Sequence, residues 1–452
     1  MSNINFPSGF IFGTSTSSFQ IEGAVKDGNR GESIWDVFSH RKGKIKTGET
    51  AETACGHYHR YSEDISLMKD MGLSAYRGSI AWTRIFPDGW GQLNQEGLDH
   101  YSRLTDLLLE AGITPYWNLF HWDLPLKLQQ EMKGFQSRDI VPIFGDYAET
   151  VVKTLGDRVA NWITLNEPWE FAGLGHFLGE HAPGIKSTKA FFKVIHHQLM
   201  AHGEAVKRIR AHCPDSNVGI AVSITPVHPL STSAKDIKAT KLANQFMNHI
   251  TLQPILTGVY PAELFKKARL LLPKITDEDM SLINTPIDFV GVNNYQREFG
   301  MHRWWVPFFN FWITGSEGGQ RKDIDGAEYT AMGWEIYPES MYEAISLVRS
   351  HNKDQKIMIT ETGIGLEDKL TGTEVRDDLR IKYLEKVFSQ IKKAIDEGAD
   401  IDGVFVWSLM DNFEWAEGYR PRFGLIHIDY KTLKRTPKAS AHWYKKIIGE
   451  NK

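Results

Sequence analysis

Short apolar segments rich in β-branched and aromatic residues recur along the whole chain. Strands buried on both faces of a parallel sheet read as near-continuous apolar runs rather than as alternating patterns. Eight segments have this character, at residues 9–14, 75–80, 114–119, 162–165, 218–222, 289–292, 356–360 and 403–407. They predict eight buried parallel strands.

The segments between these runs carry apolar residues at helical spacing. Residues 144–155, closed by Gly156, and residues 384–395, closed by Gly398, show it most clearly, and Ser137 is the expected N-cap of the first. Eight strands that alternate with helices predict an α/β fold, a (β/α)₈ barrel with long βα loops. A doubly wound open sheet is the alternative, but residues 12–17 lack the G-x-G-x-x-G turn typical of it.

No linker or low-complexity tract divides the chain, so residues 1–452 are expected to form one catalytic domain. The longest connection, residues 295–335, is predicted to be irregular. Its segment 302–312 is unusually aromatic, which is typical of either an oligomer contact or a wall of the leaving-group site. Both interpretations stay open.

Composition limits the classes of function. The formal net charge is −4, with 52 Lys and Arg against 56 Asp and Glu, which argues against nucleic acid as a partner. The chain has 2 cysteines, no stretch of signal-peptide type and no apolar run of membrane-spanning length. We therefore expect a cytoplasmic protein without membrane contact, and a homo-oligomer stays possible.

Two glutamates stand where predicted strands end. Glu167 follows residues 163–166 and Glu361 follows residues 357–360. The active site of a (β/α)₈ barrel lies at the carboxyl ends of its strands. Two carboxyl groups facing each other there can cleave a glycosidic bond, one as a protonated acid and the other as an ionised nucleophile.

The other predicted strand ends carry amide, imidazole, guanidinium and indole groups. Such groups bind sugar hydroxyls or stack on sugar rings. These candidates are Gln20, Arg77, His121, Asn166, Asn293, Tyr295, Trp407, Glu414 and Trp415. The histidine pairs at 57/59 and 196/197 have poor spacing for metal ligands, so neither a metal nor a cofactor is expected.

Several ordered motifs resemble glycoside hydrolase family 1. They are Thr164-Leu165-Asn166-Glu167-Pro168, Ile359-Thr360-Glu361-Thr362-Gly363, His121-Trp122-Asp123-Leu124-Pro125, Arg84-Ile85-Phe86-Pro87 and the run 407–415, after an opening at 10–23 and 33–36. The resemblance extends from about residue 6 to residue 445. It implies the (β/α)₈ fold and retaining hydrolysis of β-glycosides.

The resemblance also implies roles. Glu167 would be the acid/base and Glu361 the nucleophile, flanked by Arg77 and Tyr295. Asn166 would bind the 2-hydroxyl, and Trp407 would form the platform under the sugar. The other hydroxyls would be held by Gln20, His121, Glu414 and Trp415, with Asn293 and Tyr295 also at the substrate.

Three residues depart from the family pattern. Thr362 stands where Asn is usual, Asn294 where Tyr is common, and Gly78 where Phe is usual. We expect Gly78 to leave extra room beside Arg77.

The resulting hypothesis is a retaining β-glucosidase acting on terminal non-reducing glucosyl residues, and also on fucosyl or galactosyl residues. One alternative is a 6-phospho-β-glucosidase, which the Glu414 carboxylate disfavours because it would repel the phosphate. Another is a non-catalytic sugar-binding barrel, which the presence of both Glu167 and Glu361 disfavours. The expected partner is a small β-glycoside or short oligosaccharide.

Overall fold

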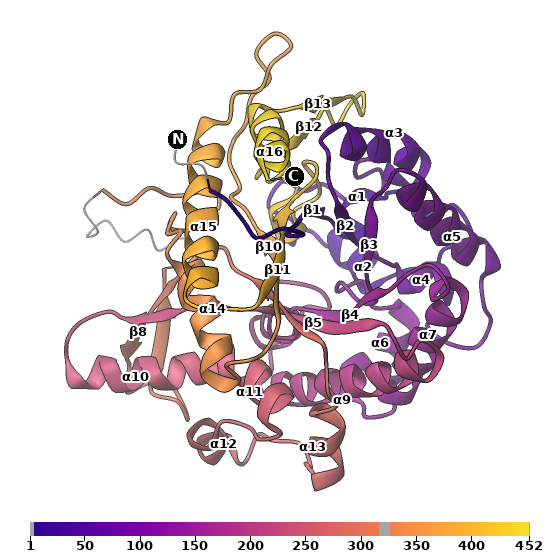
Figure 1. Cartoon of the computed structure of the whole chain (residues 1–452). Helices are drawn as coiled ribbons and strands as arrows, with labels where there is room; N and C mark the ends of the chain where they lie inside the picture. Colours follow the sequence, from indigo (N-terminus) through magenta and orange to yellow (C-terminus); the bar gives the residue numbers. More distant parts are fainter. Residues whose placement is uncertain (1–3, 316–325, 452) are drawn as a thin grey trace.

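The computed structural model describes residues 4–315 and 326–451. Eight parallel strands close into a barrel in which neighbours follow chain order and the last strand pairs with the first (Figure 1). These strands are β1 (Ile11–Ser15), β2 (Ala75–Ser79), β3 (Thr114–Asn118), β4 (Asn161–Asn166), β5 (Asn217–Ser223), β7 (Phe289–Asn293), β10 (Ile357–Thr362) and β11 (Ile401–Trp407). The predicted (β/α)₈ barrel and all eight predicted strands are confirmed.

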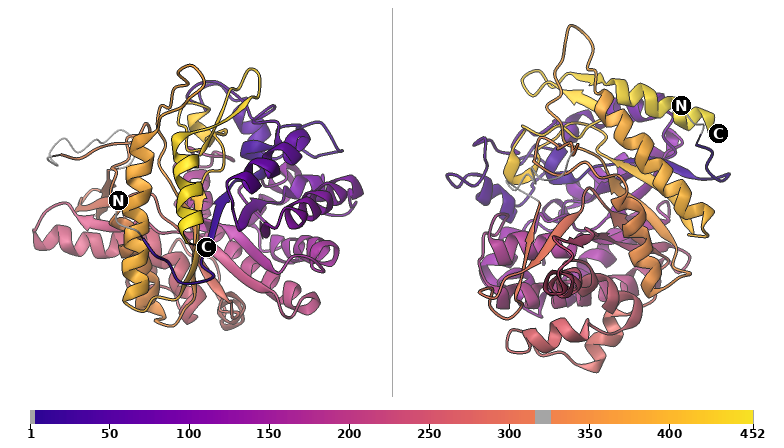
Figure 2. Two further views of the ribbon diagram at one scale, coloured as in Figure 1. Left: turned by 45° about the horizontal axis from the view of Figure 1, so that its top comes forward. Right: turned by 90° about the vertical axis from the view of Figure 1, so that its left-hand side faces the viewer.

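Helices surround the barrel (Figures 1 and 2). The α-helices are α1 (Ser18–Ile21), α2 (Ile34–Ser39), α3 (His57–Asp70), α4 (Trp82–Ile85), α5 (Gln95–Glu110), α6 (Leu126–Met132), α7 (Ile140–Leu155), α8 (Pro168–Ala172), α9 (Thr188–His212), α10 (Ala234–Asn244), α11 (Ile250–Thr257), α12 (Ala262–Ala268), α13 (Asp277–Ile283), α14 (Ser340–His351), α15 (Asp378–Asp396) and α16 (Ala439–Glu450). Short 3₁₀ turns occur at Gly134–Gln136 and Trp415–Glu417, and π-helical turns at Gly173–Leu178 and Gln245–His249. Helix α7 begins at Ile140 after Asp139, so the prediction of Ser137 as its N-cap is wrong.

The barrel interior is filled by one apolar side chain from each strand. This inner cluster contains Ile11, Ala75, Tyr116, Ile163, Ala221, Phe289, Met358 and Phe405. Successive side chains of a strand point to opposite faces, so the outward positions pack against the helices in a second, larger cluster. The inner cluster closes the barrel below the strand ends that carry the polar candidates.

The same alternation corrects the expectation for Gly78. This glycine lies on the face of β2 opposite to Arg77, where Tyr76 and Trp117 fill the layer between strands and helices. A Cβ at Gly78 would lie 2.7 Å from the Trp117 ring and 3.0 Å from the Tyr76 ring. Gly78 therefore makes room for these aromatic rings and leaves no space beside Arg77.

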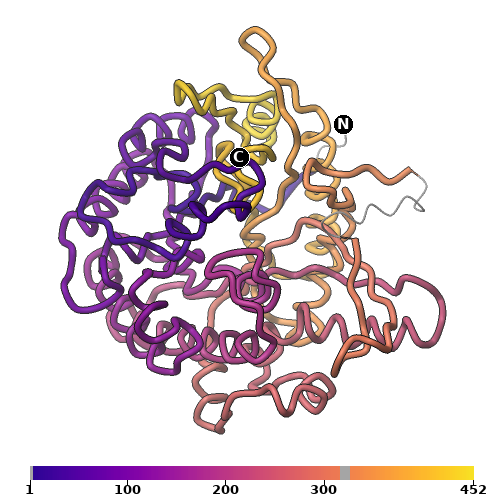
Figure 3. The backbone as a smooth tube through the Cα atoms, turned by 180° about the vertical axis from the view of Figure 1, so that it is seen from behind, coloured from indigo at the N-terminus to yellow at the C-terminus, as the bar shows by residue number. Residues whose placement is uncertain are grey.

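The connection 295–335 is partly regular, which corrects the prediction of an irregular stretch. It contains β8 (Glu298–His302) and β9 (Phe311–Thr314), which pair with each other, while β8 also pairs with β6 (Val227–Pro229). Figure 3 shows this small sheet at the side of the barrel, next to α10. The period of two is hidden because β8 is buried on both faces and β9 carries an aromatic side chain on each face, at Phe311 and Trp312. Residues 316–325 lie outside the described residues.

The first and last described segments of the chain are in contact. The backbone N–H of Phe6 donates to the Asn451 side chain at 2.8 Å. A last small sheet, β12 (Ile426–Ile428) with β13 (Arg435–Pro437), precedes α16.

Within the described residues, no helix is long and apolar enough to cross a bilayer.

Lys438 stabilises the segment that follows β11. Its fully buried ammonium donates to Asp368 at 2.5 Å and to Asp411 at 2.6 Å. Without Lys438, Asp368 keeps only Arg380 and Asp411 keeps only Arg422 as ion-pair partners within the described residues. Because both carboxylates then lose a buried partner, Lys438→Ala is expected to lower the free energy of unfolding by about 3 kcal/mol. Urea denaturation measures this value, with exposed Lys434→Ala as the control. Equal stability of the two variants would contradict the assignment.

Candidate active site

Irregular strand pairing turns the two glutamates toward the barrel axis. The pairing of β10 with β7 shifts register between Ile359 and Glu361, and that of β4 with β5 shifts between Ile163 and Asn166. A β-bulge re-aims side chains because it breaks the strict alternation of faces. Consecutive residues, Thr360 with Glu361 and Asn166 with Glu167, therefore reach the same polar cluster.

Glu361 is held by two donors from opposite sides. The Arg77 guanidinium donates to its Oε1 and the Tyr295 hydroxyl donates to its Oε2 at 2.6 Å. Arg77 is fully buried and Glu361 is 3% exposed. Two charge-assisted hydrogen bonds fix the carboxylate in one orientation. Burial, followed by the negative charge of Glu361, raises the pKa of the Tyr295 hydroxyl well above its usual value, so this group stays a proton donor.

Glu167 accepts a hydrogen bond from a neutral amide. Asn293 Nδ2 donates to Glu167 Oε1 at 2.8 Å and to Asn166 Oδ1 at 3.0 Å. Its own oxygen accepts from Thr360 at 2.6 Å, next to Glu361. Arg77 Nη2 also donates to Asn166 Oδ1, at 2.6 Å. These bonds join both glutamates in one continuous network.

The environments of the two carboxyl groups differ. Burial raises the pKa of Glu167 well above its usual value, and the nearby negative charges of Glu361 and Glu170 raise it further. Glu361, in contrast, is paired with a cation. A protonated carboxyl beside an ionised one is the arrangement that separates an acid from a nucleophile.

A second cluster lies beside the first. Gln20 Nε2 donates to Asn412 Oδ1 and to the Phe413 carbonyl, each at 3.0 Å, and to Glu414 at 3.4 Å. Glu414 also accepts a hydrogen bond from the Trp407 side chain. The connection after β1, which carries Gln20, therefore contacts the connection after β11, which carries Glu414.

His121 links the two clusters. Its Nε2 lies 3.1 Å from Asn166 Nδ2, and its ring lies nearly parallel to Trp407 and Trp415, with centroids 5.8 Å and 6.0 Å away. Burial, reinforced by the positive charge of Arg77, lowers the pKa of His121 well below its usual value, so the ring is neutral. A neutral imidazole can accept a hydrogen bond from Asn166.

The structure thus brings all the sequence-predicted candidates together. One half of the site combines aromatic rings with groups that can form hydrogen bonds to hydroxyls, and it consists of Gln20, His121, Trp407, Glu414 and Trp415. Arg77, Asn166, Glu167, Asn293, Tyr295 and Glu361 form the half that carries the charges. Among the described residues, no group of three or more His, Cys, Asp or Glu side chains is arranged to hold a metal ion.

Three further residues support the site. Thr360 orients Asn293, Asn412 binds Gln20, and Trp122 Nε1 donates to the Asn166 carbonyl at 3.0 Å. Trp122, Glu167 and Trp415 adopt positive φ angles of 75°, 47° and 48°. Left-handed backbone at non-glycine residues is strained and concentrates at functional sites. Trp122 lies in the motif His121-Trp122-Asp123-Leu124-Pro125, but the sequence assigns it no role, because neither its φ angle nor its hydrogen bond to Asn166 follows from a local pattern.

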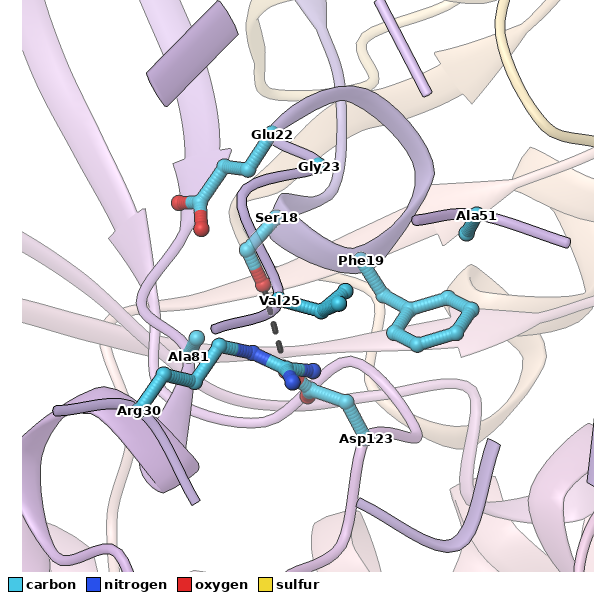
Figure 4. A pocket seen from close by; sticks show the side chains of 9 residues that line it. All are labelled: Ser18, Phe19, Glu22, Gly23, Val25, Arg30, Ala51, Ala81 and Asp123. Carbon is cyan, nitrogen blue, oxygen red and sulfur yellow. Dashed lines mark hydrogen bonds between the residues drawn. The ribbon is translucent and has the colours of Figure 1, made fainter. Parts of the chain in front are cut away.

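A small cavity of about 10 Å³ lies beside α1, whose residues Ser18 and Phe19 line it (Figure 4). It is lined by Ser18, Arg30 and Asp123 among others, and neither Glu167 nor Glu361 lines it. Ser18 donates to Asp123 at 3.3 Å, which links the segment of Gln20 to that of His121. Burial raises the pKa of Asp123 to about 7, although Arg30 opposes this shift. The space suits about one water, too little for a sugar.

The coupling of the two glutamates is directly measurable. Replacing Glu361 by the isosteric Gln removes a negative charge that raises the pKa of Glu167, so this pKa is expected to fall. ¹³C NMR of carboxyl-labelled glutamate in the Glu361→Gln variant reports this pKa. An unchanged or higher pKa would show that the two carboxyl groups do not interact.

Comparisons with known proteins agree with this geometry. The sequence model of "Glycosyl hydrolase family 1" matches residues 2–452. "Beta-glucosidase A" of Acetivibrio thermocellus is 44% identical over 100% of both chains. "Beta-glucosidase A" of Thermotoga maritima is 42% identical and covers 99% of this chain and 98% of its own length.

Solved structures give the same result. A Thermotoga maritima family 1 glycoside hydrolase complexed with a cyclophellitol analogue transition state mimic superposes with a TM-score of 0.95 at 42% identity, over 100% of this chain and 99% of the other. The Thermotoga maritima β-glucosidase in complex with deoxynojirimycin reaches 0.94 over 99% of each chain.

Proposed function

The chain belongs to glycosyl hydrolase family 1, and we propose that it is a β-glucosidase in which Glu361 is the nucleophile and Glu167 the acid/base. Its substrate is a β-glycoside whose terminal non-reducing glucosyl residue is released with retention. The observation that carries these roles is the contrast between the two carboxyl groups. The Glu361 carboxylate is paired with Arg77 and Tyr295, whereas the Glu167 carboxyl accepts a side-chain hydrogen bond only from the neutral amide of Asn293 within the described residues.

The first step makes a glycosyl-enzyme. A Glu361 oxygen attacks the anomeric carbon while the bond to the leaving oxygen breaks, and Glu167 transfers its proton to that oxygen. Asn166 binds the 2-hydroxyl in this proposal, which is supported by the hydrogen bonds from Arg77 and Asn293 that fix its amide oxygen.

The second step reverses the role of Glu167. Once Glu361 is esterified its negative charge is gone, so the pKa of Glu167 falls and its carboxylate can accept a proton. It removes a proton from water, the water oxygen attacks the anomeric carbon from the side the leaving group left, and Glu361 is released. Two inversions leave the configuration unchanged.

The residues around Gln20 and Glu414 determine which sugar is preferred. Burial, with the nearby negative charges of Glu361 and Glu417, raises the pKa of Glu414 to about 8. A neutral carboxyl both donates and accepts hydrogen bonds, which suits hydroxyl groups in either orientation. We propose that fucosides and galactosides are also hydrolysed, because the same groups tolerate a changed hydroxyl.

The test compares 4-nitrophenyl β-glucoside with its 6-phosphate. No cation is among the hydrogen-bond or ion-pair partners of Glu414 in the described residues. A phosphate dianion bound beside Glu414 would therefore have no positive side chain to offset its charge. We expect the plain glucoside to have a kcat/KM at least about 100-fold higher. Faster cleavage of the phosphorylated substrate would instead establish a 6-phospho-β-glucosidase.

We propose that residues 1–452 are one catalytic domain acting in the cytoplasm on small glycosides. Both cysteines, the buried Cys55 and the half-buried Cys213, are free thiols, which suits a reducing compartment. A full-length sample that unfolds in a single transition would support the single domain, and two separate transitions would contradict it.

A further inference from the structure

The turn between β8 and β9 exposes four large aromatic side chains. In this segment, residues 303–312 and called here the aromatic hairpin, Trp304 is 75% exposed, Trp305 58%, Phe308 48% and Trp312 54%. Figure 1 shows β8 beside α10, at the edge of the molecule. Large apolar patches on a protein surface mark sites that bind a partner or a ligand.

The base of the aromatic hairpin is anchored in the core. Phe309 and Phe311 are buried, and each ring centroid lies 5.8 Å from that of Phe246. Phe309 also lies 6.3 Å from Phe192 on α9. Because these buried rings fix its base, the aromatic hairpin presents its exposed rings from a firmly held position.

The same anchor continues to the catalytic site. The Trp169 ring lies 5.8 Å from Phe246, and its Nε1 donates to the Phe246 carbonyl at 2.7 Å. Trp169 belongs to α8, whose first residue follows Glu167 directly. The acid/base protonates the leaving oxygen, so the leaving group lies on the side of Glu167 and α8. The aromatic hairpin is therefore joined to the leaving-group side through one layer of rings.

The lack of charge on the aromatic hairpin indicates that its ligand is neutral. Residues 304–312 contain no ionisable side chain, and Arg303 lies over the Trp305 ring, 5.3 Å from its centroid. Such a surface offers apolar faces and indole N–H donors to a neutral ligand. Pyranose rings fit this description, since they combine apolar C–H faces with hydroxyl groups.

We propose that the aromatic hairpin is a carbohydrate-binding surface that stacks on the reducing-end glucosyl units of β-linked oligosaccharides longer than a disaccharide. This inference rests on the proposed function, because it extends the leaving-group side of that site. A single cation held against an indole gives little attraction for an anionic membrane. The continuity with α8 favours the substrate chain over a second protein copy as the occupant.

The experiment compares Trp304→Ala/Trp305→Ala and Trp312→Ala with wild type on three substrates. The matched control is Leu93→Ala, an apolar side chain 40% exposed between α4 and α5 on the other side of the barrel. For 4-nitrophenyl β-glucoside and cellobiose, kcat/KM is expected to stay within about twofold of wild type. For cellopentaose, it is expected to fall about tenfold in the double variant, mostly through KM, because each lost ring uncovers apolar sugar surface.

A binding measurement separates this inference from the proposed function. In the Glu361→Ala background, calorimetry with cellopentaose is expected to give about tenfold weaker binding when Trp304 and Trp305 are also replaced. Failure of wild type to cleave 4-nitrophenyl β-glucoside would sink the proposed function, whereas unchanged cellopentaose kinetics and binding would sink the carbohydrate surface alone.

Three other results would also overturn the carbohydrate surface. They are an equal loss of activity on all three substrates, dissociation of an oligomer in the double variant, and sedimentation with phosphatidylcholine vesicles that depends on the aromatic hairpin. The last two outcomes would assign it to self-association and to a lipid surface, respectively.

Discussion

Glu361→Ala is expected to abolish hydrolysis of β-glucosides, with kcat reduced by about 10⁵-fold or more. The substitution removes the oxygen that bonds to the anomeric carbon, and Arg77 and Tyr295 lose the carboxylate to which both donate. Steady-state kinetics with 4-nitrophenyl β-glucoside measures the loss.

A small anion provides the control for this variant. Azide fits the space left by the carboxylate and can attack the anomeric carbon in its place. Turnover should then return with α-glucosyl azide as product, because one displacement inverts the centre. Binding of a non-hydrolysed thioglucoside should persist, which shows that the variant is folded. Activity within about tenfold of wild type would remove Glu361 from the mechanism.

Glu167→Ala is expected to slow hydrolysis strongly for substrates with a poor leaving group and much less in the first step for substrates with a good one. Cellobiose needs a proton on its departing oxygen, so its kcat/KM should fall about 10²- to 10⁴-fold. A dinitrophenyl glucoside leaves without protonation, so its first step should remain fast. The second step still lacks its base, and a burst of phenolate followed by slow turnover is expected.

Azide also tests whether Glu167 acts as the general base in the second step. It needs no general base, so it should accelerate the slow second step of Glu167→Ala and give β-glucosyl azide, the product of two inversions. Stopped-flow absorbance and NMR of the product provide the data. Equal losses for cellobiose and the dinitrophenyl glucoside, without a burst, would show that Glu167 is not the acid/base.

The sequence predicts the barrel well because the signals for its strands are local. Each strand is buried on both faces and appears as an apolar run, as residues 289–292 do for β7. The small sheet of β6, β8 and β9 escaped prediction for the opposite reason. Exposed Trp312 and buried Phe311 are both aromatic, so the alternation of the two faces is invisible in the sequence.

The site could be predicted as a set of residues, but its geometry could not. Motifs identify Glu167 and Glu361, yet strict alternation would place only one of Thr360 and Glu361 on the axis side. The register shifts in β4 and β10 bring both neighbours inward, and they depend on pairing with distant strands. Positive φ at Trp122 likewise arises from tertiary contacts, among them its hydrogen bond to Asn166. The expectation for Gly78 is wrong because adjacent residues of a strand face opposite sides, so Gly78 packs against Trp117 and Tyr76 and not beside Arg77.

The stereochemistry of the first product tests the two-glutamate mechanism most directly. ¹H NMR recorded during hydrolysis of 4-nitrophenyl β-glucoside distinguishes the anomers of glucose before they equilibrate. A covalent intermediate on Glu361, opened by water that Glu167 activates, predicts that β-glucose appears first and α-glucose only later by mutarotation. Early α-glucose would mean that water attacks the substrate directly, and it would contradict Glu361 as the nucleophile.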